Sequence, residues 1–273
     1  MNVKFTKMSG AGNDFVVIDD RRRRIRNGPK AAKLLCDRKW GIGADGLLLL
    51  QKSRRAAYKM MYYNADGSYG GMCGNGGRCI AFYAFSGKIA SRIHRFEALD
   101  HIYCATVSRT EVILTMKDPR NALLRLEIVL ESNRLPVSFI DTGSPHVVVA
   151  VESLKGAASV DDVDVLRLGS MIRHHEHFAP AGTNVNFIER AGPNSIRVRT
   201  FERGVEDETL ACGTGSIASA IIATRWWNII PPVTVIPKSR MPLWVDFSEL
   251  DGSIRNVRLA GPAKVVYTGL VEL

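Results

Sequence analysis

Apolar residues occur along this chain in short runs, and most of these runs predict β-strands. The clearest are residues 15–19, 46–52, 58–63, 111–116, 126–131, 146–151, 185–188 and 196–201. Each has the length of a strand rather than of a helix, and turn-forming residues separate them. We therefore expect a chain rich in strands, with few helices.

Helices are predicted at residues 31–38 and 165–174, the second with Asp164 as its N-cap. Two further segments, 73–85 and 212–226, are rich in Ala and Ile and carry few charges, and each begins at a cysteine. A helix that is apolar nearly all round is a buried one. We expect these two helices to lie in the core.

The two cysteine-led helices belong to an internal repeat. In the first half, residues 62–67 (YYNADG) precede 72–76 (MCGNG), and in the second half residues 200–204 (TFERG) precede 211–215 (ACGTG). Both halves read strand, polar turn, Cys-Gly-X-Gly and buried helix. The repeat predicts an α/β (α+β) fold of two pseudo-symmetric domains, each a mixed, largely antiparallel sheet or barrel around a central helix. We place the domains at residues 1–117 and 118–261, with the active site in the cleft between them.

Composition agrees with a soluble globular protein, because 46% of the 273 residues are hydrophobic and 23% are charged. No signal peptide or membrane span is predicted. Five cysteines make an odd count, so we expect reduced thiols and a cytoplasmic protein rather than a disulfide framework. The formal net charge is +10, which keeps a basic nucleic-acid-binding protein open as an alternative. The basic residues are scattered apart from 21–24 (RRRR), which we interpret as a solvated loop before turn residues 27–29 (NGP).

The repeated Cys-Gly-X-Gly motif carries the candidate chemistry. The first turn of a helix has unpaired N–H groups and a partial positive charge, and a thiol there has a lowered pKa. The same N–H groups can hold a carboxylate. Two such helix starts facing each other would place Cys73 and Cys212 on opposite sides of the α-carbon of an amino acid, with one thiolate removing the proton and the other thiol delivering one.

Other cysteines and histidines have weaker claims. Cys36 and Cys104 are predicted to be core residues, and Cys79 to pack within its helix. Residues 174–177 (HHEH) could suggest zinc, but an exposed helix end explains them better, and Cys73 and Cys79 lack the usual ligand spacing. No metal site is predicted.

At these residues the sequence resembles the diaminopimelate epimerase family. The matching segments are residues 10–15 (GAGNDF), 64–68 (NADGS), 72–79 (MCGNGGRC), 142–146 (TGSPH), 182–187 (GTNVNF), 202–206 (ERGVE), 208–215 (ETLACGTG) and 261–264 (GPAK). They span nearly the whole chain. The resemblance implies a homodimeric epimerase of lysine and peptidoglycan precursor biosynthesis that interconverts LL- and meso-diaminopimelate without pyridoxal phosphate or metal. It also implies that residues 262–273 return to the first domain as a strand.

The resemblance implies a role for each matching residue. Cys73 and Cys212 would be the acid/base pair, with His146 and Glu202 beside the reacting centre. The remaining residues would bind the substrate: Gly74, Asn75, Gly213 and Thr214 at the reacting carboxylate, and Asn13, Asn64, Asn184 and Arg203 at the distal amino-acid head. Ser144 and Gly46 depart from residues common in the family, Asn and Gln, and this affects the distal head only.

Two rivals share the fold class. A proline racemase or hydroxyproline epimerase also uses two cysteines, but it would leave Arg203 and the several asparagines unexplained. A phenazine-pathway type of isomerase would lack the cysteine pair. For the nucleic-acid-binding alternative, salt-dependent retention on DNA or RNA is the discriminating observation.

Overall fold

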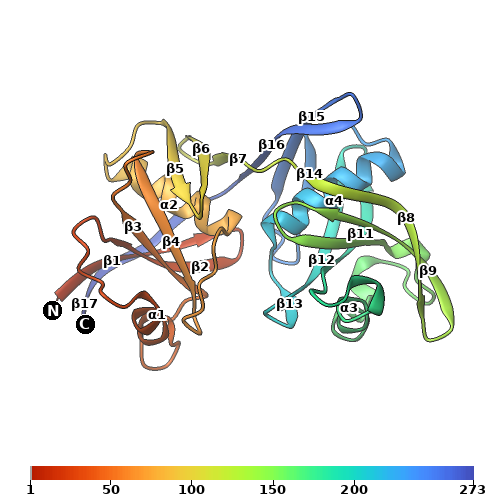
Figure 1. The fold of residues 1–273 in the computed structure, drawn as a ribbon, viewed down its shortest axis with the longest axis horizontal. Helices are drawn as coiled ribbons and strands as arrows, with labels where there is room; N and C mark the ends of the chain where they lie inside the picture. The colour runs from red at the N-terminus through yellow and green to blue at the C-terminus, as the bar shows by residue number, and fades with distance from the viewer. Residues whose placement is uncertain (1) are drawn as a thin grey trace. The chain divides into compact units, whose positions relative to one another are not determined.

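The computed structural model describes residues 2–273 as a mixture of strands and helices in two compact units. The first unit comprises Met1–Thr115 and Ala260–Leu273, and the second comprises Met116–Leu259. Each unit has its own sheet and its own buried helix, as Figure 1 shows. The expected α+β class is confirmed.

The first unit is built on one mixed sheet in the order β17, β1, β2, β3, β4, β5, β6, β7. These strands are β1 (Asn2–Gly10), β2 (Asn13–Asp19), β3 (Gly46–Gln51), β4 (Tyr58–Asn64), β5 (Ile93–Ala98), β6 (His101–Val107), β7 (Val112–Thr115) and β17 (Lys264–Glu272). The pairs β2–β3 and β4–β5 are parallel, and the other pairs are antiparallel. The C-terminal strand β17 thus completes this sheet by pairing with β1.

The buried helix α2 (Gly74–Ser86) contacts strands from both ends of this sheet, including β1, β2, β6 and β7, so the sheet curves around it. The second helix, α1 (Gly28–Cys36), packs on the other face against β3 and β4. Strand β3 is therefore buried on both faces, with Leu47 and Leu49 in the cluster that includes α1. This explains why its sequence is a continuous apolar run instead of an alternating one.

The second unit repeats this plan with the strand order β8, β9, β10, β11, β12, β14, β15, β16. Its strands are β8 (Arg120–Leu130), β9 (Asn133–Asp141), β10 (Pro145–Ala150), β11 (Asn184–Gly192), β12 (Ser195–Glu202), β13 (Asp207–Thr209), β14 (Val233–Ile236), β15 (Leu243–Leu250) and β16 (Ser253–Gly261). The pairs β10–β11 and β12–β14 are parallel, while β9–β10, β11–β12 and β14–β15 are antiparallel. The short strand β13 pairs with the end of β12.

The helices of the second unit occupy matching places in the chain order. Helix α4 (Gly213–Trp227) follows β12 and contacts β9, β10, β11, β12, β14 and β15, and α3 (Val165–Arg173) packs on β11 and β12. Apart from the short 3-10 turns and β13, the second unit reads β-β-β-α-β-β-α-β-β-β along the chain, and the first reads β-β-α-β-β-α-β-β-β, with β17 in the place that corresponds to β8. The successive pairs from β17–β1 to β5–β6 are parallel or antiparallel in the same order as the pairs from β8–β9 to β14–β15. The repeat that the sequence predicted extends to the topology.

Three local predictions need correction. Residues 27–29, predicted as a turn, start helix α1, because the Asn27 side chain accepts a hydrogen bond from the N–H of Lys30 (3.0 Å) and proline fits the first turn. Strand β8 begins at Arg120, inside the predicted break, and accommodates Asn121 and Arg125 with positive φ through shifts in register. Cys104 is half-buried on β6, not a core residue.

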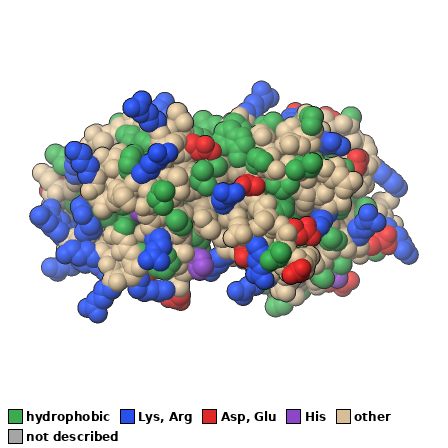
Figure 2. Space-filling view, turned by 90° about the horizontal axis from the view of Figure 1, so that it is seen from above, with side chains coloured by type: hydrophobic (Ala, Val, Ile, Leu, Met, Phe, Trp, Pro, Cys, Tyr) green, Lys and Arg blue, Asp and Glu red, His purple; other side chains and the backbone are tan. Residues whose placement is uncertain are grey.

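The basic residues do not gather in one place on the face that Figure 2 shows, where Lys and Arg side chains are distributed among hydrophobic and acidic ones. Arg21, Arg22, Arg23 and Arg24 are exposed, as predicted for a solvated loop, and Arg21 forms an ion pair with Asp19 (2.6 Å). Within residues 2–273, no helix combines the length and the apolar character needed to cross a membrane.

Candidate functional site

Both repeated cysteines are helix N-caps with nearly the same backbone conformation. Cys73 has φ −113° and ψ 126° at the start of α2, and Cys212 has φ −109° and ψ 118° at the start of α4. In each case the sulfur accepts a hydrogen bond from the backbone N–H three residues later, Gly76 (3.5 Å) and Gly215 (3.4 Å). The predicted placement of the two thiols at helix N-termini is confirmed, and each sulfur faces an N–H donor and the positive end of a helix dipole.

In the first unit, a chain of side-chain hydrogen bonds starts beside Cys73. Arg78, which is fully buried, donates from Nη2 to Oδ1 of Asn75 (2.7 Å), and Asn75 donates to Oδ1 of Asn13. The amide of Asn13 in turn donates to Oδ2 of Asp45 (3.0 Å). Each acceptor fixes the orientation of the next amide, so Asn75 and Asn13, both predicted site residues, are held together in a defined arrangement.

Charged residues surround the Asn13–Asp45 end of this series of hydrogen bonds. Asp14 forms ion pairs with Lys7 (2.7 Å) and Arg38 (3.0 Å), and Arg38 also forms an ion pair with Asp45 (2.7 Å). Although burial opposes it, these hydrogen bonds lower the pKa of Asp14, which therefore stays ionised. The segment around Asn13 is thus fixed by ionic contacts.

Asn64 lies at the end of β4 and closes a turn. Its side chain donates to Oγ of Ser68 (2.9 Å), and its carbonyl accepts from the N–H of Gly67 (2.9 Å). These two contacts serve the turn, so the role of Asn64 at the distal head stays a prediction.

In the second unit, Cys212 is linked to a histidine through a threonine. The sulfur of Cys212 lies 3.4 Å from Oγ1 of Thr214, and Oγ1 of Thr214 lies 2.9 Å from Nε2 of His146. Ser144 joins the same cluster, with its Oγ 3.0 Å from Nε2 of His146. Two predicted site residues that are 68 positions apart in the sequence, His146 on β10 and Thr214 on α4, are therefore in contact.

His146 is fully buried, and this determines its charge. Burial, with the positive charge of Arg203 as a second cause, lowers the pKa of His146 to about 3. The imidazole is consequently neutral over the whole physiological pH range. Burial acts in the other direction on Glu202, where it raises the pKa of the carboxyl group.

Asn184 connects two loops near this cluster. Its Nδ2 donates to the carbonyl of Pro145 (2.8 Å), and its Oδ1 accepts from the N–H of Arg203 (2.9 Å). The guanidinium of Arg203 donates to the carbonyl of Ala181 (3.2 Å). Asn184 thus positions the segments that carry His146 and Arg203.

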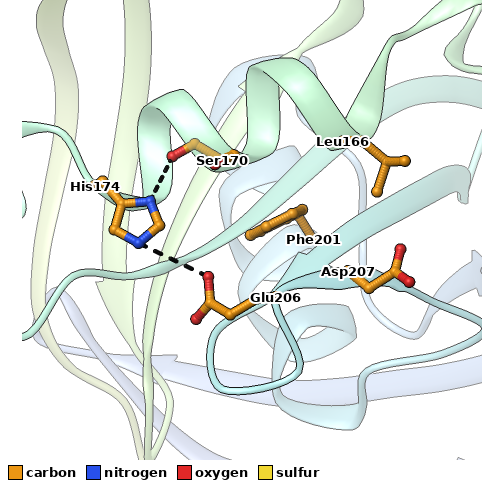
Figure 3. A pocket seen from close by; sticks show the side chains of 6 residues that line it. All are labelled: Leu166, Ser170, His174, Phe201, Glu206 and Asp207. Atoms are coloured by element: carbon orange, nitrogen blue, oxygen red, sulfur yellow. Dashed lines mark hydrogen bonds and ion pairs between the residues drawn. The ribbon is translucent and has the colours of Figure 1, made fainter.

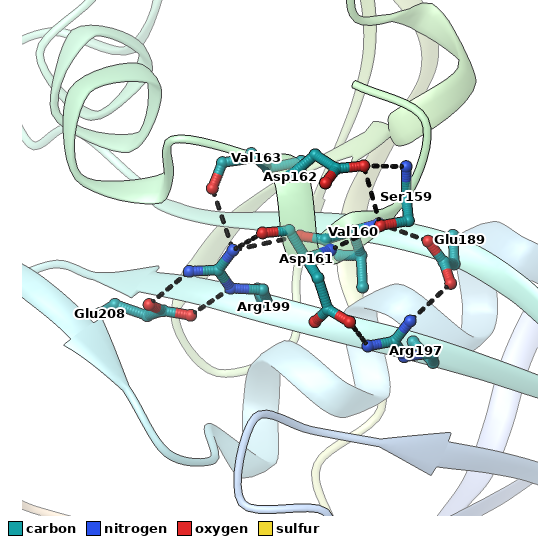
Figure 4. Close-up of polar contacts among 9 residues, drawn as sticks. All are labelled: Ser159, Val160, Asp161, Asp162, Val163, Glu189, Arg197, Arg199 and Glu208. Atoms are coloured by element: carbon teal, nitrogen blue, oxygen red, sulfur yellow. Dashed lines mark hydrogen bonds and ion pairs between the residues drawn. The ribbon is translucent and has the colours of Figure 1, made fainter. Parts of the chain in front are cut away.

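An ionic network fixes the strand that leads into Cys212. Figure 4 shows Arg199 of β12 between Glu208 and the carbonyls of Val160, Asp161 and Val163, and Arg197 between Asp161 and Glu189. Glu208 lies on β13 and also receives Lys238. Because Cys212 follows β13 by only a short loop, this network holds the approach to the α4 N-terminus in place.

A surface pocket in the second unit contains none of the predicted site residues. It is lined by Leu166, Ser170, His174, Phe201, Glu206 and Asp207, and Figure 3 shows His174 between Ser170 and Glu206. His174 donates from Nδ1 to the carbonyl of Ser170 (3.0 Å), and Glu206 forms an ion pair with Arg173 (3.1 Å). These polar groups are already paired with one another, so the pocket is a structural feature beside α3.

Comparison with known proteins now decides the family. The diaminopimelate epimerase family profile matches residues 5–101 and 138–229. The chain is 43% identical to the diaminopimelate epimerase of Chlorobaculum tepidum over 270 residues, covering 97% of this chain and 100% of that relative. It is 38% identical to the diaminopimelate epimerase of Aquifex aeolicus over 282 residues, covering 98% and 97%. The chain belongs to the diaminopimelate epimerase family.

Solved structures outside the diaminopimelate epimerase family share its fold. A Bacillus anthracis phenazine biosynthesis protein of the PhzF family matches with a TM-score of 0.76 at 14% identity, covering 100% of both chains. A hydroxyproline epimerase from Agrobacterium vitis matches with a TM-score of 0.74 at 15% identity, covering 99% of this chain and 92% of that chain. At such low identity these likenesses establish the fold alone.

The Gly46 departure from the diaminopimelate epimerase pattern has a local cause. A Cβ atom at this position would lie 2.5 Å from the ring of Tyr62 and 2.7 Å from the carbonyl of Tyr63. Any larger residue here would require Tyr62 to move, so the packing of β4 against β3 in this chain requires glycine at position 46.

Sequence reasoning missed the residues behind the site, which are Asp45 and Arg78 in the first unit and Thr142, Asn186 and Thr200 in the second. Thr142 donates to the carbonyl of Thr214 (3.0 Å), Asn186 contacts His146 (3.1 Å), and Thr200 donates to Asn186 (3.0 Å). Arg78 carried a signal, since it is a lone charge in an otherwise apolar part of a buried helix. Asn186 carried a similar one, a polar residue between Val185 and Phe187 on a buried strand.

Proposed function

We propose that this chain interconverts LL- and meso-diaminopimelate by proton transfer at one α-carbon, with Cys73 and Cys212 as the two acid/base groups. In one direction, the thiolate of one cysteine takes the α-proton and the thiol of the other gives a proton to the opposite face of the carbon. The observation that carries the proposal is that both cysteines are helix N-caps with equivalent hydrogen bonds in topologically equivalent units.

The helix starts also suit the charge that develops during the reaction. Loss of the α-proton places negative charge on the substrate carboxylate, and N–H groups at a helix N-terminus stabilise charge there. We propose that Gly74 and Asn75 at one helix, and Gly213 and Thr214 at the other, bind this carboxylate. No added cofactor or metal is part of the proposal, because the thiols and N–H groups supply the acid, the base and the electrostatic stabilisation.

His146 and Glu202 complete the proposed catalytic group. His146 reaches Cys212 through Thr214 and is neutral, so we propose that it acts as a fixed hydrogen-bonding group, not as a base. Glu202 is adjacent to Arg203 at the end of β12, and its raised pKa suits a carboxyl group close to a negatively charged substrate.

For the distal amino-acid head, we propose Asn13, Asn64, Asn184 and Arg203. Arg203 is the sharpest of these assignments, because a planar guanidinium binds a carboxylate with two parallel hydrogen bonds and lysine cannot do so. Arg203→Lys should raise the KM for diaminopimelate at least ~10-fold, while circular dichroism stays unchanged. An unaltered KM would remove Arg203 from the site.

A homodimer is proposed as well. Strand β17 is exposed along most of its length, and Val266 and Leu270 leave 53% and 70% of their surface open. Exposed apolar side chains on a sheet edge favour association with a second copy. Leu270→Lys should shift the protein toward monomer in sedimentation, and an unchanged dimer would place the interface elsewhere.

We also propose a cytoplasmic location, which the free thiols of Cys36, Cys79 and Cys104 support. The direct test of the function is conversion of LL-diaminopimelate to the meso form by protein treated with chelator and given no pyridoxal phosphate. Absence of conversion, with turnover of proline or hydroxyproline instead, would refute it.

A further inference from the structure

The side chain of Asn186 has only one orientation that satisfies its neighbours. It is fully buried on β11, where its Nδ2 donates to the carbonyl of Val147 (3.0 Å) and its Oδ1 accepts from the hydroxyl of Thr200 (3.0 Å). A carbonyl can only accept, so the nitrogen of the amide must face Val147. Gly215 gives the space for this arrangement, because a Cβ there would lie 2.4 Å from Oδ1 of Asn186.

This orientation determines the tautomer of His146. The same Nδ2 of Asn186 lies 3.1 Å from Nδ1 of His146, and an amide nitrogen can only donate. Nδ1 therefore accepts and carries no hydrogen. Since the buried ring is neutral, its one N–H is at Nε2.

The position of that hydrogen sets the direction of the next hydrogen bonds. Nε2–H faces Oγ1 of Thr214 (2.9 Å) and Oγ of Ser144 (3.0 Å), and Ser144 in turn donates to Oγ1 of Thr214 (3.2 Å). Thr214 therefore accepts, either from His146 directly or through Ser144. The hydroxyl hydrogen of Thr214 then has the sulfur of Cys212 as its acceptor, at 3.4 Å.

We propose that Asn186 is a positioning residue, which fixes the His146 tautomer and so makes the Thr214 hydroxyl a donor to the Cys212 sulfur. The hydroxyl of Thr214 and the N–H of Gly215 (3.4 Å) then both donate to the sulfur, and both favour thiolate over thiol. With the other tautomer, Thr214 would donate to Nε2, and the sulfur would lose one of them. The inference rests on the proposed role of Cys212 as an acid/base group, but its first test requires no substrate.

The tautomer can be read directly from long-range ¹H–¹⁵N correlation spectra of protein labelled at histidine. The chain has six histidines, and loss of one signal set in His146→Gln assigns the right one. His94 is an internal reference with the opposite tautomer, because its Nδ1 faces the carbonyl of Ser91 (2.7 Å) and its Nε2 faces the hydroxyl of Tyr58 (3.2 Å). We expect a bare Nδ1 and a protonated Nε2 for His146; the His94 pattern at His146 would overturn the proposal.

A double-mutant cycle then tests whether Asn186 acts through Thr214. The rate of alkylation of Cys212 is measured near neutral pH by peptide mapping. Thr214→Val should lower this rate by roughly 10-fold, and Thr214→Ser should restore it. Asn186→Leu should also lower the rate of alkylation of Cys212, and the double variant should be alkylated no more slowly than Thr214→Val alone. Additive effects would show that Asn186 acts only through general packing, and would also overturn the proposal.

Ser216→Ala is the matched control. Ser216 is buried in the same helical turn, but its hydroxyl donates to the carbonyl of Cys212 (2.8 Å) and not to the sulfur, so its removal should leave the alkylation rate unchanged. The tautomer and the alkylation rates are measured on the enzyme alone. If they agree with the inference while LL-diaminopimelate is not converted, the proposed function fails and the hydrogen-bond chain stands.

Discussion

Replacing His146 with glutamine should weaken the dependence of stability on acid pH. The pKa of His146 falls from the ordinary 6.5 to about 3 because the ring is buried, so the folded protein does not take up the proton that the unfolded chain takes up. This contribution to stability is fully present above about pH 6.5 and is lost progressively as the pH falls toward 3. Glutamine has no such proton.

The size of the effect follows from the two pKa values. At pH 5 an unfolded histidine is almost fully protonated, whereas His146 in the fold is still neutral. The free energy of unfolding should therefore fall by about 2 kcal/mol between pH 8 and pH 5 through this one group. That is a large part of the 5–15 kcal/mol that stabilises a typical domain.

Urea unfolding at pH 8 and pH 5 measures the difference. Wild type and His146→Gln share every other titrating group, including Glu202, whose raised pKa acts in the opposite direction. The pH-dependent loss in free energy of unfolding should be about 2 kcal/mol smaller in the variant, and the exposed His177→Gln should keep the wild-type loss. If His146→Gln keeps it too, His146 is not a buried neutral group and the reasoning about its tautomer fails.

Three further predictions concern the site. Cys73→Ala and Cys212→Ala should each lower the rate of epimerisation at least ~10²-fold. Cys36→Ala should lower it little, because burial raises the pKa of Cys36 to about 12 and keeps it an inert thiol. Near-normal rates of LL-diaminopimelate conversion in Cys212→Ala would contradict the paired-thiol mechanism. Arg78→Met should change the free energy of unfolding by less than about 2 kcal/mol, since the loss of its hydrogen bond to Asn75 is offset by the removal of a buried charge. Its kcat should nevertheless fall about 10-fold, because Asn75 loses its fixed orientation. If the variant is as stable in urea as wild type and has the same kcat, Arg78 does not position Asn75 for the reaction. Gly215→Ala should slow Cys212 alkylation and reduce stability by about 1–3 kcal/mol because its Cβ meets Asn186, and an unchanged thermal midpoint would show that Asn186 can move at no cost.

The central elements of the site could be predicted from the sequence because their signals are local. Cys-Gly-X-Gly before an apolar helix identifies the N-cap from neighbouring residues alone, and its repetition around Cys73 and Cys212 identified the two units. The start of α1 was missed for a similarly local reason, since Asn-Gly-Pro serves equally as a turn and as a helix start.

The residues behind the site depend on contacts between distant segments. Asn184 and Asn186 alternate with apolar residues in the same way, but the parallel register of β10 and β11 pairs the first with His146 and the second with Val148. Nothing in the sequence of either strand fixes that register. Arg78 similarly reaches the carbonyl of Pro262, 184 positions away, where the C-terminal segment returns.

The same limit applies to charge. Neither the +10 formal charge nor the motif around His146 indicates that this ring is neutral, because its pKa depends on the complete burial that β10, β11 and α4 produce together. The sequence could name the histidine but not its protonation state.

Isotope incorporation tests the two-thiol mechanism most directly. LL-diaminopimelate is incubated with the enzyme in deuterated water, and the meso product is examined by mass spectrometry and proton NMR at the first few per cent of conversion. The mechanism predicts one solvent deuterium at the inverted α-carbon of nearly every product molecule, because the proton removed by one cysteine is not the one delivered by the other. Early product that keeps its original hydrogen would show that a single group carries the proton across, and would contradict the account.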